Sequence, residues 1–437
     1  VEGQLWWFSP VIHVRVGDVG FHQKSITINH TKVLANLTNF PMLLKIESDT
    51  DLADHMQSDG DDIRFLQNGI QLNHEIEYFN VSTGDLIAWV NVTHLSSTED
   101  TYVIMQYGNE SWSSQENASG VWDASYHGVW HFHDDFLDST AYENHGTNYG
   151  SNDTNGWIGN GQYFDGSPDY ITAPDHCLGI ENSWTASCWS NSNTSSSNLF
   201  HYFLSTGDYG SMNSVNIWQN NDNTPDLGEM RAQIVDSSGQ SIDMWSYGGT
   251  NYNDDQWHLV HVTWNAATHN LSIYSDGSLE NSTINANVDT GTGTTNLLHI
   301  GSRTDFDLNR ALIGSLDEVR ISNPIKNTSW IATEYNNQFD PNNFYTISAP
   351  LTPYQEPLID DEQPINGSMN KPLNPPISAF IYDLQGDDMN ITFSSNASGS
   401  WQIMESYNTV GNGTYTVQPM NMTEYNTTYY WCVNISD

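Results

Sequence analysis

Short runs of alternating apolar and polar residues dominate the chain, and clusters of Gly, Asn, Asp and Ser separate them. Alternation with a period of two is typical of β-strands, and the periodicity of an amphipathic helix is almost absent. In residues 86–92 (LIAWVNV), for example, Leu86, Ala88, Val90 and Val92 share one face. The pattern therefore predicts an all-β chain.

Two stretches predict local elements more sharply. Residues 273–279 (IYSDGSL) end a strand in an Asp-Gly pair, which favours the tight turn of a β-hairpin. The segment 328–338 (TSWIATEYNNQ) predicts a short helix, with Asn327 or Thr328 as its N-cap.

The same pattern divides the chain into several domains, and 437 residues suffice for more than one hydrophobic core. We expect an N-terminal extension at residues 1–20, a β-sandwich at 21–120 and a second β-domain at 121–345. A Pro-bearing stretch at 346–366 has the composition of a semi-rigid linker, and a last β module occupies 367–437.

The charge balance is strongly acidic. Eleven Lys and Arg stand against 53 Asp and Glu, which gives a formal net charge of −42. Nucleic acids and anionic lipids bind through Lys and Arg, so the scarcity of bases argues against both partners. The resulting field attracts cations, and calcium, which takes carboxylate and carbonyl oxygens, is the candidate. No apolar run of eighteen residues predicts a membrane span.

Asn-x-Ser/Thr sequons are about twice as frequent as the composition predicts. With 48 Asn and 82 Ser plus Thr, chance gives about nine sequons, whereas the chain has eighteen. The excess favours an exported protein with N-linked glycans. The acceptor residues are Asn29, Asn36, Asn80, Asn91, Asn109, Asn117, Asn152, Asn193, Asn270, Asn281, Asn327, Asn366, Asn390, Asn396, Asn412, Asn421, Asn426 and Asn434.

Three cysteines are too few for a disulfide scaffold, and no Cys-x-x-Cys pair indicates zinc. Cys177 and Cys188 are spaced so that they could bridge two neighbouring strands, which would add roughly 2–4 kcal/mol without strain. We expect this disulfide, with two free thiols as the alternative. Cys432 has no evident partner.

The middle of the chain resembles the concanavalin-A-like, laminin-G-like jelly-roll family over most of the domain. The resemblance implies a jelly roll, and it says little about function because this fold carries lectins, adhesins, hydrolases and inert spacers. The carrying stretches are GQYFDGSPDYI (161–171), SWTASCW (183–189), QWHLVHVTWN (256–265), HIGSR (299–303) and GSLDEVRISN (314–323).

The first domain resembles a domain of unknown function that often precedes such jelly rolls in archaeal and bacterial surface proteins. The match covers about ninety residues, among them SDGDDIRF (58–65) and LNHEIEYFN (72–80). The last segment resembles an immunoglobulin- or fibronectin-like repeat that stops before its final strand. These resemblances imply an extracellular, multidomain protein of a prokaryotic cell surface, with an archaeal source expected.

Motifs for catalysis are absent. A jelly-roll glucanase carries its acids as Glu-x-Asp-x-Glu on one strand, and no such stretch occurs. Simple alternation puts Asp317 and Glu318 on opposite faces, so they are not expected to act as a pair. No Gly-x-Ser-x-Gly or phosphate-binding loop is present. We therefore expect no enzyme, with a secreted glycoside hydrolase as a weak alternative.

Asp317 is the candidate metal ligand. Alternation places it on the inner face with Val319 and Ile321, while Glu318 and Arg320 form an exposed pair worth about 0–1 kcal/mol. A buried carboxylate needs N–H donors or a cation. Asp317 is thus expected either to cap loop amides or to serve a calcium site. The family resemblance implies that the loop 133–146 approaches this strand. Its oxygen ligands would be Asp135, Asp138 and Asn144.

Taken together, these features favour a glycosylated structural or adhesive protein of the cell surface, such as a filament or surface-layer subunit. A carbohydrate-binding protein acting on external polysaccharide is the alternative. The alternating stretch VIHVRV (11–16) suggests a strand that could complete the C-terminal module of a neighbouring copy, head to tail. It could instead join the first domain's own sheet, and the missing strand could lie beyond residue 437.

Overall fold

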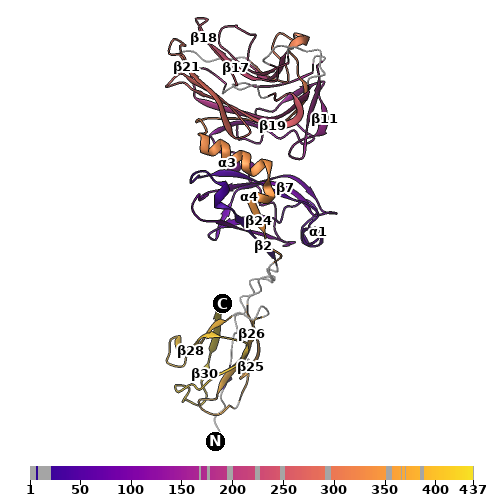
Figure 1. The fold of residues 1–437 in the computed structure, drawn as a ribbon. Coiled ribbons are helices and arrows are strands. Elements are labelled where there is room, and N and C mark those ends of the chain that lie inside the picture. The colour runs from indigo at the N-terminus through magenta and orange to yellow at the C-terminus, as the bar shows by residue number, and fades with distance from the viewer. Residues whose placement is uncertain are drawn as a thin grey trace. The chain divides into compact units, whose positions relative to one another are not determined.

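The computed structural model describes most of the chain (Figure 1). Two compact units result, one of residues 24–349 and one of residues 1–23 with 350–437. Every sheet of both units is made of short strands, so the prediction of an all-β, multidomain sandwich protein is confirmed. The described residues are 6–7, 21–166, 169–174, 178–193, 200–221, 227–246, 251–290, 297–350, 357–365, 367–369, 371–383 and 388–436.

The first sandwich packs a five-stranded sheet, in the order β24-β2-β8-β4-β5, on a three-stranded sheet, β3-β7-β6. Strand β24 follows the second domain in sequence and pairs with β2, so two separate chain segments build this sandwich. The strands are β2 (His22–Ile28), β3 (Phe40–Ile46), β4 (Arg64–Gln67), β5 (Ile70–Leu72), β6 (His74–Asn80), β7 (Asp85–Val92), β8 (Thr101–Tyr107) and β24 (Tyr345–Ile347), with the short helices η1 (His30–Lys32), α1 (Thr50–His55) and α2 (Ala118–Val121).

The jelly roll packs a seven-stranded sheet, β10-β13-β22-β15-β16-β17-β18, on an eight-stranded sheet, β11-β12-β23-β14-β19-β20-β21, in which β9 also pairs with β23. The strands are β9 (Tyr126–Trp130), β10 (Thr147–Tyr149), β11 (Asn152–Asn155), β12 (Asn160–Asp165), β13 (Tyr170–Pro174), β14 (Trp184–Asn193), β15 (Phe200–Ser205), β16 (Ser214–Asn220), β17 (Met230–Val235), β18 (Ser241–Trp245), β19 (Asp254–Asn265), β20 (Asn270–Ser275), β21 (Ser278–Ile284), β22 (Leu297–Ile300) and β23 (Ile313–Ser322), with the 3-10 turn η2 (Leu308–Arg310).

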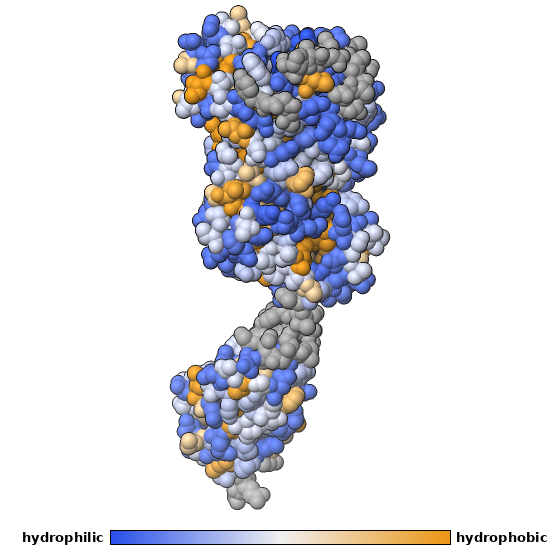
Figure 2. All heavy atoms as spheres, in the orientation of Figure 1, coloured by the Kyte–Doolittle hydropathy of each residue, from blue (hydrophilic) through white to orange (hydrophobic). Residues whose placement is uncertain are grey.

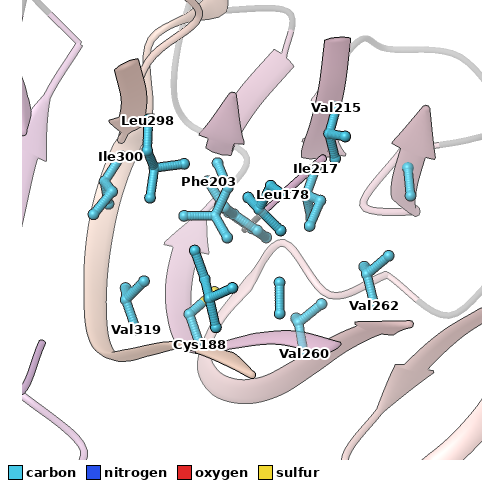
Figure 3. Packing of buried hydrophobic residues seen from close by; sticks show 14 of the residues in the cluster. Leu178, Cys188, Phe203, Val215, Ile217, Val260, Val262, Leu298, Ile300 and Val319 are labelled. Atoms are coloured by element: carbon cyan, nitrogen blue, oxygen red, sulfur yellow. The ribbon is translucent and has the colours of Figure 1, made fainter. Parts of the chain in front are cut away.

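Alternate residues of these strands fill the space between the two sheets (Figure 3). Cys188, Val260 and Val262 of the eight-stranded sheet face Phe203 and Ile217 of the seven-stranded sheet. The Asp-Gly hairpin is confirmed between β20 and β21, where Asp276 and Gly277 both have positive φ.

Strand β7 is buried on both faces. Leu86, Ala88, Val90 and Val92 pack into the first sandwich, as alternation predicts. The opposite face joins a second core with residues of the jelly roll: Ile87, Trp89, Trp122, Val129 and Ile158 are among its members. The two sandwiches of residues 24–349 therefore share a hydrophobic contact.

Helix α3 (Thr328–Phe339) is confirmed where the sequence predicts it, and Asn327 is its N-cap, accepting a 2.9 Å hydrogen bond from the amide of Trp330. Trp330 packs edge-on against Phe40 of the first sandwich. At the other end, Gln338 accepts a 2.6 Å hydrogen bond from Nε1 of Trp189 in the jelly roll. The short helix α4 (Pro341–Phe344) then leads into β24.

The C-terminal unit has two three-stranded sheets, β25-β26-β29 and β28-β27-β31, around a core that includes Phe393 and Trp431. A two-stranded pairing joins β1 to β30 in parallel. The segment 11–16 lies outside the described residues. The strands are β1 (Trp6–Trp7), β25 (Leu358–Gln363), β26 (Ile377–Tyr382), β27 (Met389–Ser395), β28 (Gln402–Val410), β29 (Gly413–Val417), β30 (Thr428–Tyr429) and β31 (Trp431–Ser436).

Helices of membrane-spanning length and apolarity are absent from the described part of the chain. On the face shown in Figure 2, the described surface is mainly hydrophilic, with scattered apolar patches.

Candidate functional site

A β-bulge in β23 changes the orientation expected for Asp317. Ser187 and Trp189 of β14 are two residues apart, but their partners Arg320 and Asp317 on β23 are three apart. The extra residue is accommodated with Glu318 at φ 52°. Because of this shift, Asp317 and Arg320 lie on the same face of the sheet, away from the jelly-roll core. The prediction that Asp317 faces the core with Val319 is therefore wrong.

The pair of Glu318 and Arg320 forms as predicted, but it is buried rather than exposed. Their side chains are 1% and 3% exposed, and Arg320 donates to Oε2 of Glu318. The guanidinium also lies over the rings of Trp89 and Trp122, 4.1 and 4.8 Å from their centroids. A buried, hydrogen-bonded pair of this kind is far more sensitive to loss of one partner than an exposed pair.

Helix α3 extends this network. Glu334 accepts a 2.9 Å hydrogen bond from Nη1 of Arg320, and its other oxygen lies 3.2 Å from Nε2 of His261. Burial alone would raise the pKa of Glu334, but His261, Arg320 and Lys326 outweigh it and lower the pKa to about 2. Burial lowers the pKa of Lys326 to about 8.

His131, directly after β9, lies among three carboxylates. Its Nδ1 is 2.8 Å from Oε1 of Glu318 and 3.6 Å from Oε2 of Glu77, and its Nε2 is 3.3 Å from Oε2 of Glu75. Burial would lower the pKa of His131, but Glu318 and Glu75 raise it well above its ordinary value. Sequence reasoning missed this cluster, although Ile87 and Trp89 on the second face of β7 were a signal that β6 and β7 are covered.

A cleft of about 610 Å³ opens beside His131, between the first sandwich and the loop 133–146. Its walls include Glu75, Glu77, His131, His133, Asp138 and His145. The cleft therefore connects the buried carboxylates with solvent.

The residues expected to bind calcium are engaged with different loops. Asp138 accepts hydrogen bonds of 2.8–3.0 Å from the amides of Val129, Thr140 and Asn144, which makes it a cap of its own loop. Asp317 accepts a 2.8 Å hydrogen bond from the amide of Ile158. These bonds fit the alternative in which both carboxylates cap backbone amides.

The other two expected ligands are also hydrogen-bonded within the chain. Asp135 accepts a 2.9 Å bond from the amide of Leu137, and the side chain of Asn144 donates to the carbonyl of His127. Calcium binding at this set stays a prediction.

Most sequon asparagines that the structure describes are exposed or half-buried. Two are not: Asn91 and Asn109 are 5% and 7% exposed, and Nδ2 of Asn91 donates a 2.8 Å hydrogen bond to Gly120. The side chains of Asn193 and Asn366 lie outside the described part. Cys177 of the expected disulfide does as well, whereas Cys188 is a buried free thiol in the jelly-roll core.

A second concave site crosses the end of the eight-stranded sheet. The register pairs Tyr163 with Ser315, Ser315 with Asn191, and Asn191 with Trp257, so these four side chains form a row on the outer face. The row lines a groove of about 280 Å³ together with Asn155 and Asp255. We call it the Tyr163–Trp257 groove. With strands about 4.8 Å apart, its two aromatic ends are separated by about 14 Å.

Two family models match the chain. Residues 165–332 match the model described as Concanavalin A-like lectin/glucanases superfamily. This part of the chain is therefore similar to concanavalin A-like domains. Residues 59–155 match the model described as Domain of unknown function (DUF2341), a range that includes Glu75, Glu77, His131 and His133. The lining residues of the cleft fall within 59–155. The Tyr163–Trp257 groove takes Asn191, Trp257 and Ser315 from the range 165–332, and Tyr163 lies just before that range. No curated protein sequence matches the chain significantly.

Several solved structures are similar to the chain at low identity. The binding domain of botulinum neurotoxin serotype D is 14% identical, with a TM-score of 0.40, over 61% of this chain and 74% of that one. Domain 4 of the extracellular arabinanase AbnA from Geobacillus stearothermophilus, in complex with arabinotriose, is 19% identical, with a TM-score of 0.39, over 48% and 98%. The CBM40 of the Ruminococcus gnavus IT-sialidase, bound to α2,3-sialyllactose, is 9% identical, with a TM-score of 0.29, over 35% and 83%.

Proposed function

We propose that this chain is an extracellular carbohydrate-binding protein that holds a neutral polysaccharide in the Tyr163–Trp257 groove. The observation that carries the proposal is the row of two aromatic side chains, with Ser315 and Asn191 between them, on the concanavalin A-like domain. Tyr163 is 39% exposed and Trp257 is half-buried, so both rings are held in place while they reach solvent.

The groove has the two kinds of group that a sugar chain needs. Aromatic rings pack against the apolar C–H faces of a pyranose, and amide, hydroxyl and carboxylate groups bind its hydroxyls. Asn155, Asn191 and Asp255 supply such polar groups beside the rings. A length of about 14 Å accommodates several sugar rings in a row, which suits a polymer better than a single sugar.

The net charge restricts the class of polysaccharide. At −42, the protein repels polyanions such as uronate or sulfate polymers. The groove itself includes the carboxylate of Asp255 and no Lys or Arg among its described lining residues. A neutral polymer is therefore the ligand class that both the lining and the field allow.

A glycan array followed by calorimetry tests this function. Trp257→Ala and Tyr163→Ala should each weaken binding about fivefold or more, since an aromatic contact is worth roughly 1 kcal/mol. Tyr102→Ala is the matched control, because Tyr102 is 60% exposed on the first sandwich, far in sequence from the groove. Absence of any selective glycan binding, or equal affinity of all three variants, would refute the proposal.

A structural role in a surface assembly is the second candidate. The observation that favours it is the parallel pairing of Trp6–Trp7 with Thr428–Tyr429 in the C-terminal unit. If the same pairing forms between copies, the contact is head-to-tail and builds an open chain of subunits. Such a subunit would carry N-linked glycans and would display the groove repeatedly along a filament.

Deleting residues 1–20 tests the assembly. Light scattering and electron microscopy of native material should show polymers that the truncated protein does not form. Polymers of the truncated protein, or monomeric native material, would contradict exchange of this segment. The deletion leaves the groove intact, so glycan binding and assembly are measured independently.

A further inference from the structure

The side chains around His131 have the composition of a transition-metal site. Glu77 of β6, His131 and Glu318 of β23 each offer one ligand atom, and these atoms lie within 4.8 Å of one another. A fourth group is near, since Nδ1 of His133 is 3.5 Å from Oε1 of Glu77. Imidazole nitrogens and carboxylate oxygens are the donors that zinc and related divalent ions accept. Calcium instead takes six to eight oxygens.

The separations match a tetrahedral ion. Bonds of 2.0–2.2 Å in that geometry place neighbouring ligand atoms about 3.4 Å apart. Nδ1 of His133 lies 3.5 Å from Oε1 of Glu77, the oxygen that is offered to the ion. Nδ1 of His131 lies 3.6 Å from the other oxygen of the same carboxylate, Oε2. His131 and Glu318 are closer, at 2.8 Å. They would have to separate by about 0.6 Å, which is within the reach of a rotamer adjustment.

Buried acceptors at the cluster are left without donors. Oε1 of Glu77 has no hydrogen-bond partner among the described residues, although the side chain is 2% exposed. Oδ1 of Asp317, which is fully buried, also has no hydrogen-bond partner among the described residues. A buried carboxylate oxygen is costly unless a donor or cation meets it.

Each ligand is held by a second contact that leaves a different atom free. Glu75 lies 3.3 Å from Nε2 of His131, which leaves Nδ1 for the ion. Arg320 donates to Oε2 of Glu318, and Nε1 of Trp89 donates a 2.9 Å bond to Oε2 of Glu77. Carboxylates behind a ligating imidazole and donors behind a ligating carboxylate are typical of metal sites, because they fix the orientation of the ligands.

We propose that Glu77, His131 and Glu318 bind a divalent transition ion of the zinc class, with His133 as the fourth ligand on the cleft side. The ligands come from both sandwiches of residues 24–349, so the ion would join them. The cleft of about 610 Å³ gives the ion access from solvent. The site shares no proposed ligand with the Tyr163–Trp257 groove or with the calcium set of Asp135, Asp138, Asn144 and Asp317.

The test uses the full chain, stripped with a chelator and freed of it by gel filtration. Calorimetric titration with zinc chloride should give one strong site per chain, and elemental analysis should find one zinc retained after a second gel filtration. At a hundredfold excess over Kd, the melting temperature should rise by about 5 °C. Cobalt should give the absorption bands of a tetrahedral ion with nitrogen and oxygen ligands.

Glu77→Gln keeps the shape of the side chain and should weaken zinc binding at least a hundredfold. If Glu77→Gln fails to fold, His133→Gln tests the site instead, because His133 lies at the cleft wall. This substitution should lower the affinity for zinc about tenfold or more. His94→Gln is the control, because His94 is an exposed histidine outside the cluster. Failure of the wild-type chain to retain zinc, or retention of full affinity by His133→Gln and Glu77→Gln, overturns the proposal, as does loss of binding in His94→Gln.

Discussion

Acidification should weaken the contact of helix α3 with the jelly roll through Glu334. Its pKa is lowered from an ordinary value of 4.5 to about 2 by His261, Arg320 and Lys326. For a carboxyl group with a depressed folded-state pKa, the unfolded state binds the proton first. The stabilisation is therefore complete above pH 4.5 and is lost as the pH falls towards 2.

The size of the effect follows from the same shift. At about 1.4 kcal/mol for each pH unit, lowering the pKa from 4.5 to about 2 stabilises the folded state by about 3 kcal/mol at neutral pH. About 2 kcal/mol of this is lost between pH 6 and pH 3. Glu334 is 7% exposed, so solvent screening reduces the figure little.

The contribution of Glu334 to the free energy of unfolding can be measured by urea unfolding of wild type and Glu334→Gln at several pH values, with tryptophan fluorescence as the signal. At pH 6 the variant should be less stable by about 3 kcal/mol or more, since it removes one of the two carboxylates bonded to Arg320 and the carboxylate beside His261. The difference between the two proteins should then narrow by about 2 kcal/mol by pH 3. Glu99→Gln, at an exposed position of the first sandwich, should show no such narrowing. A difference that stays constant from pH 6 to pH 3 would refute the assignment.

Three further outcomes follow from the structure. Arg320→Met should destabilise the chain by roughly 3–5 kcal/mol in urea unfolding, because it removes the guanidinium bonded to two buried carboxylates, whereas an exposed pair would have cost about 1 kcal/mol at most. If calcium binds near Asp138, millimolar calcium should raise the melting temperature above the value in chelator, and the melting temperature of Asp138→Asn should not change. Equal melting temperatures of the wild-type chain in calcium and in chelator would exclude the site. Glycopeptide mass spectrometry of native material should find at least half of the sequons occupied but Asn91 and Asn109 unmodified, since both are buried, and an unmodified mass of 49.1 kDa would exclude glycosylation altogether.

Local patterns in the sequence were sufficient for the fold class and for several elements. The hairpin at Asp276–Gly277 and the helix capped by Asn327 depend on residues that are adjacent in sequence, so their chemistry is visible there. The burial of Leu86 and Val90 follows from alternation for the same reason. Interactions between segments far apart in sequence leave no such local signal.

Glu318 is the point at which alternation fails. Its positive φ is unusual for a residue with a Cβ, and no residue type in the segment LDEVRIS indicates it. The bulge turns Asp317 and Arg320 to the same face, on which Glu77 of β6 and His131, directly after β9, lie close to Asp317. Strict alternation along the strand assigns Asp317 and Arg320 to opposite faces, so it does not predict the acid cluster.

The bulge also explains why so many charges are buried in one place. An apolar contact between the sandwiches, built from residues such as Ile87 and Val129, is tolerant of sliding because it is not directional. The hydrogen bonds of His131 and Ser139 to Glu75 of β6 are directional, and each breaks if the sandwiches shift by more than about 1 Å. Charged groups at this junction therefore contribute a unique orientation more than they contribute stability. An ion held by Glu77, His131 and Glu318 would act in the same sense, since its bonds to ligands of both sandwiches tolerate still smaller displacements.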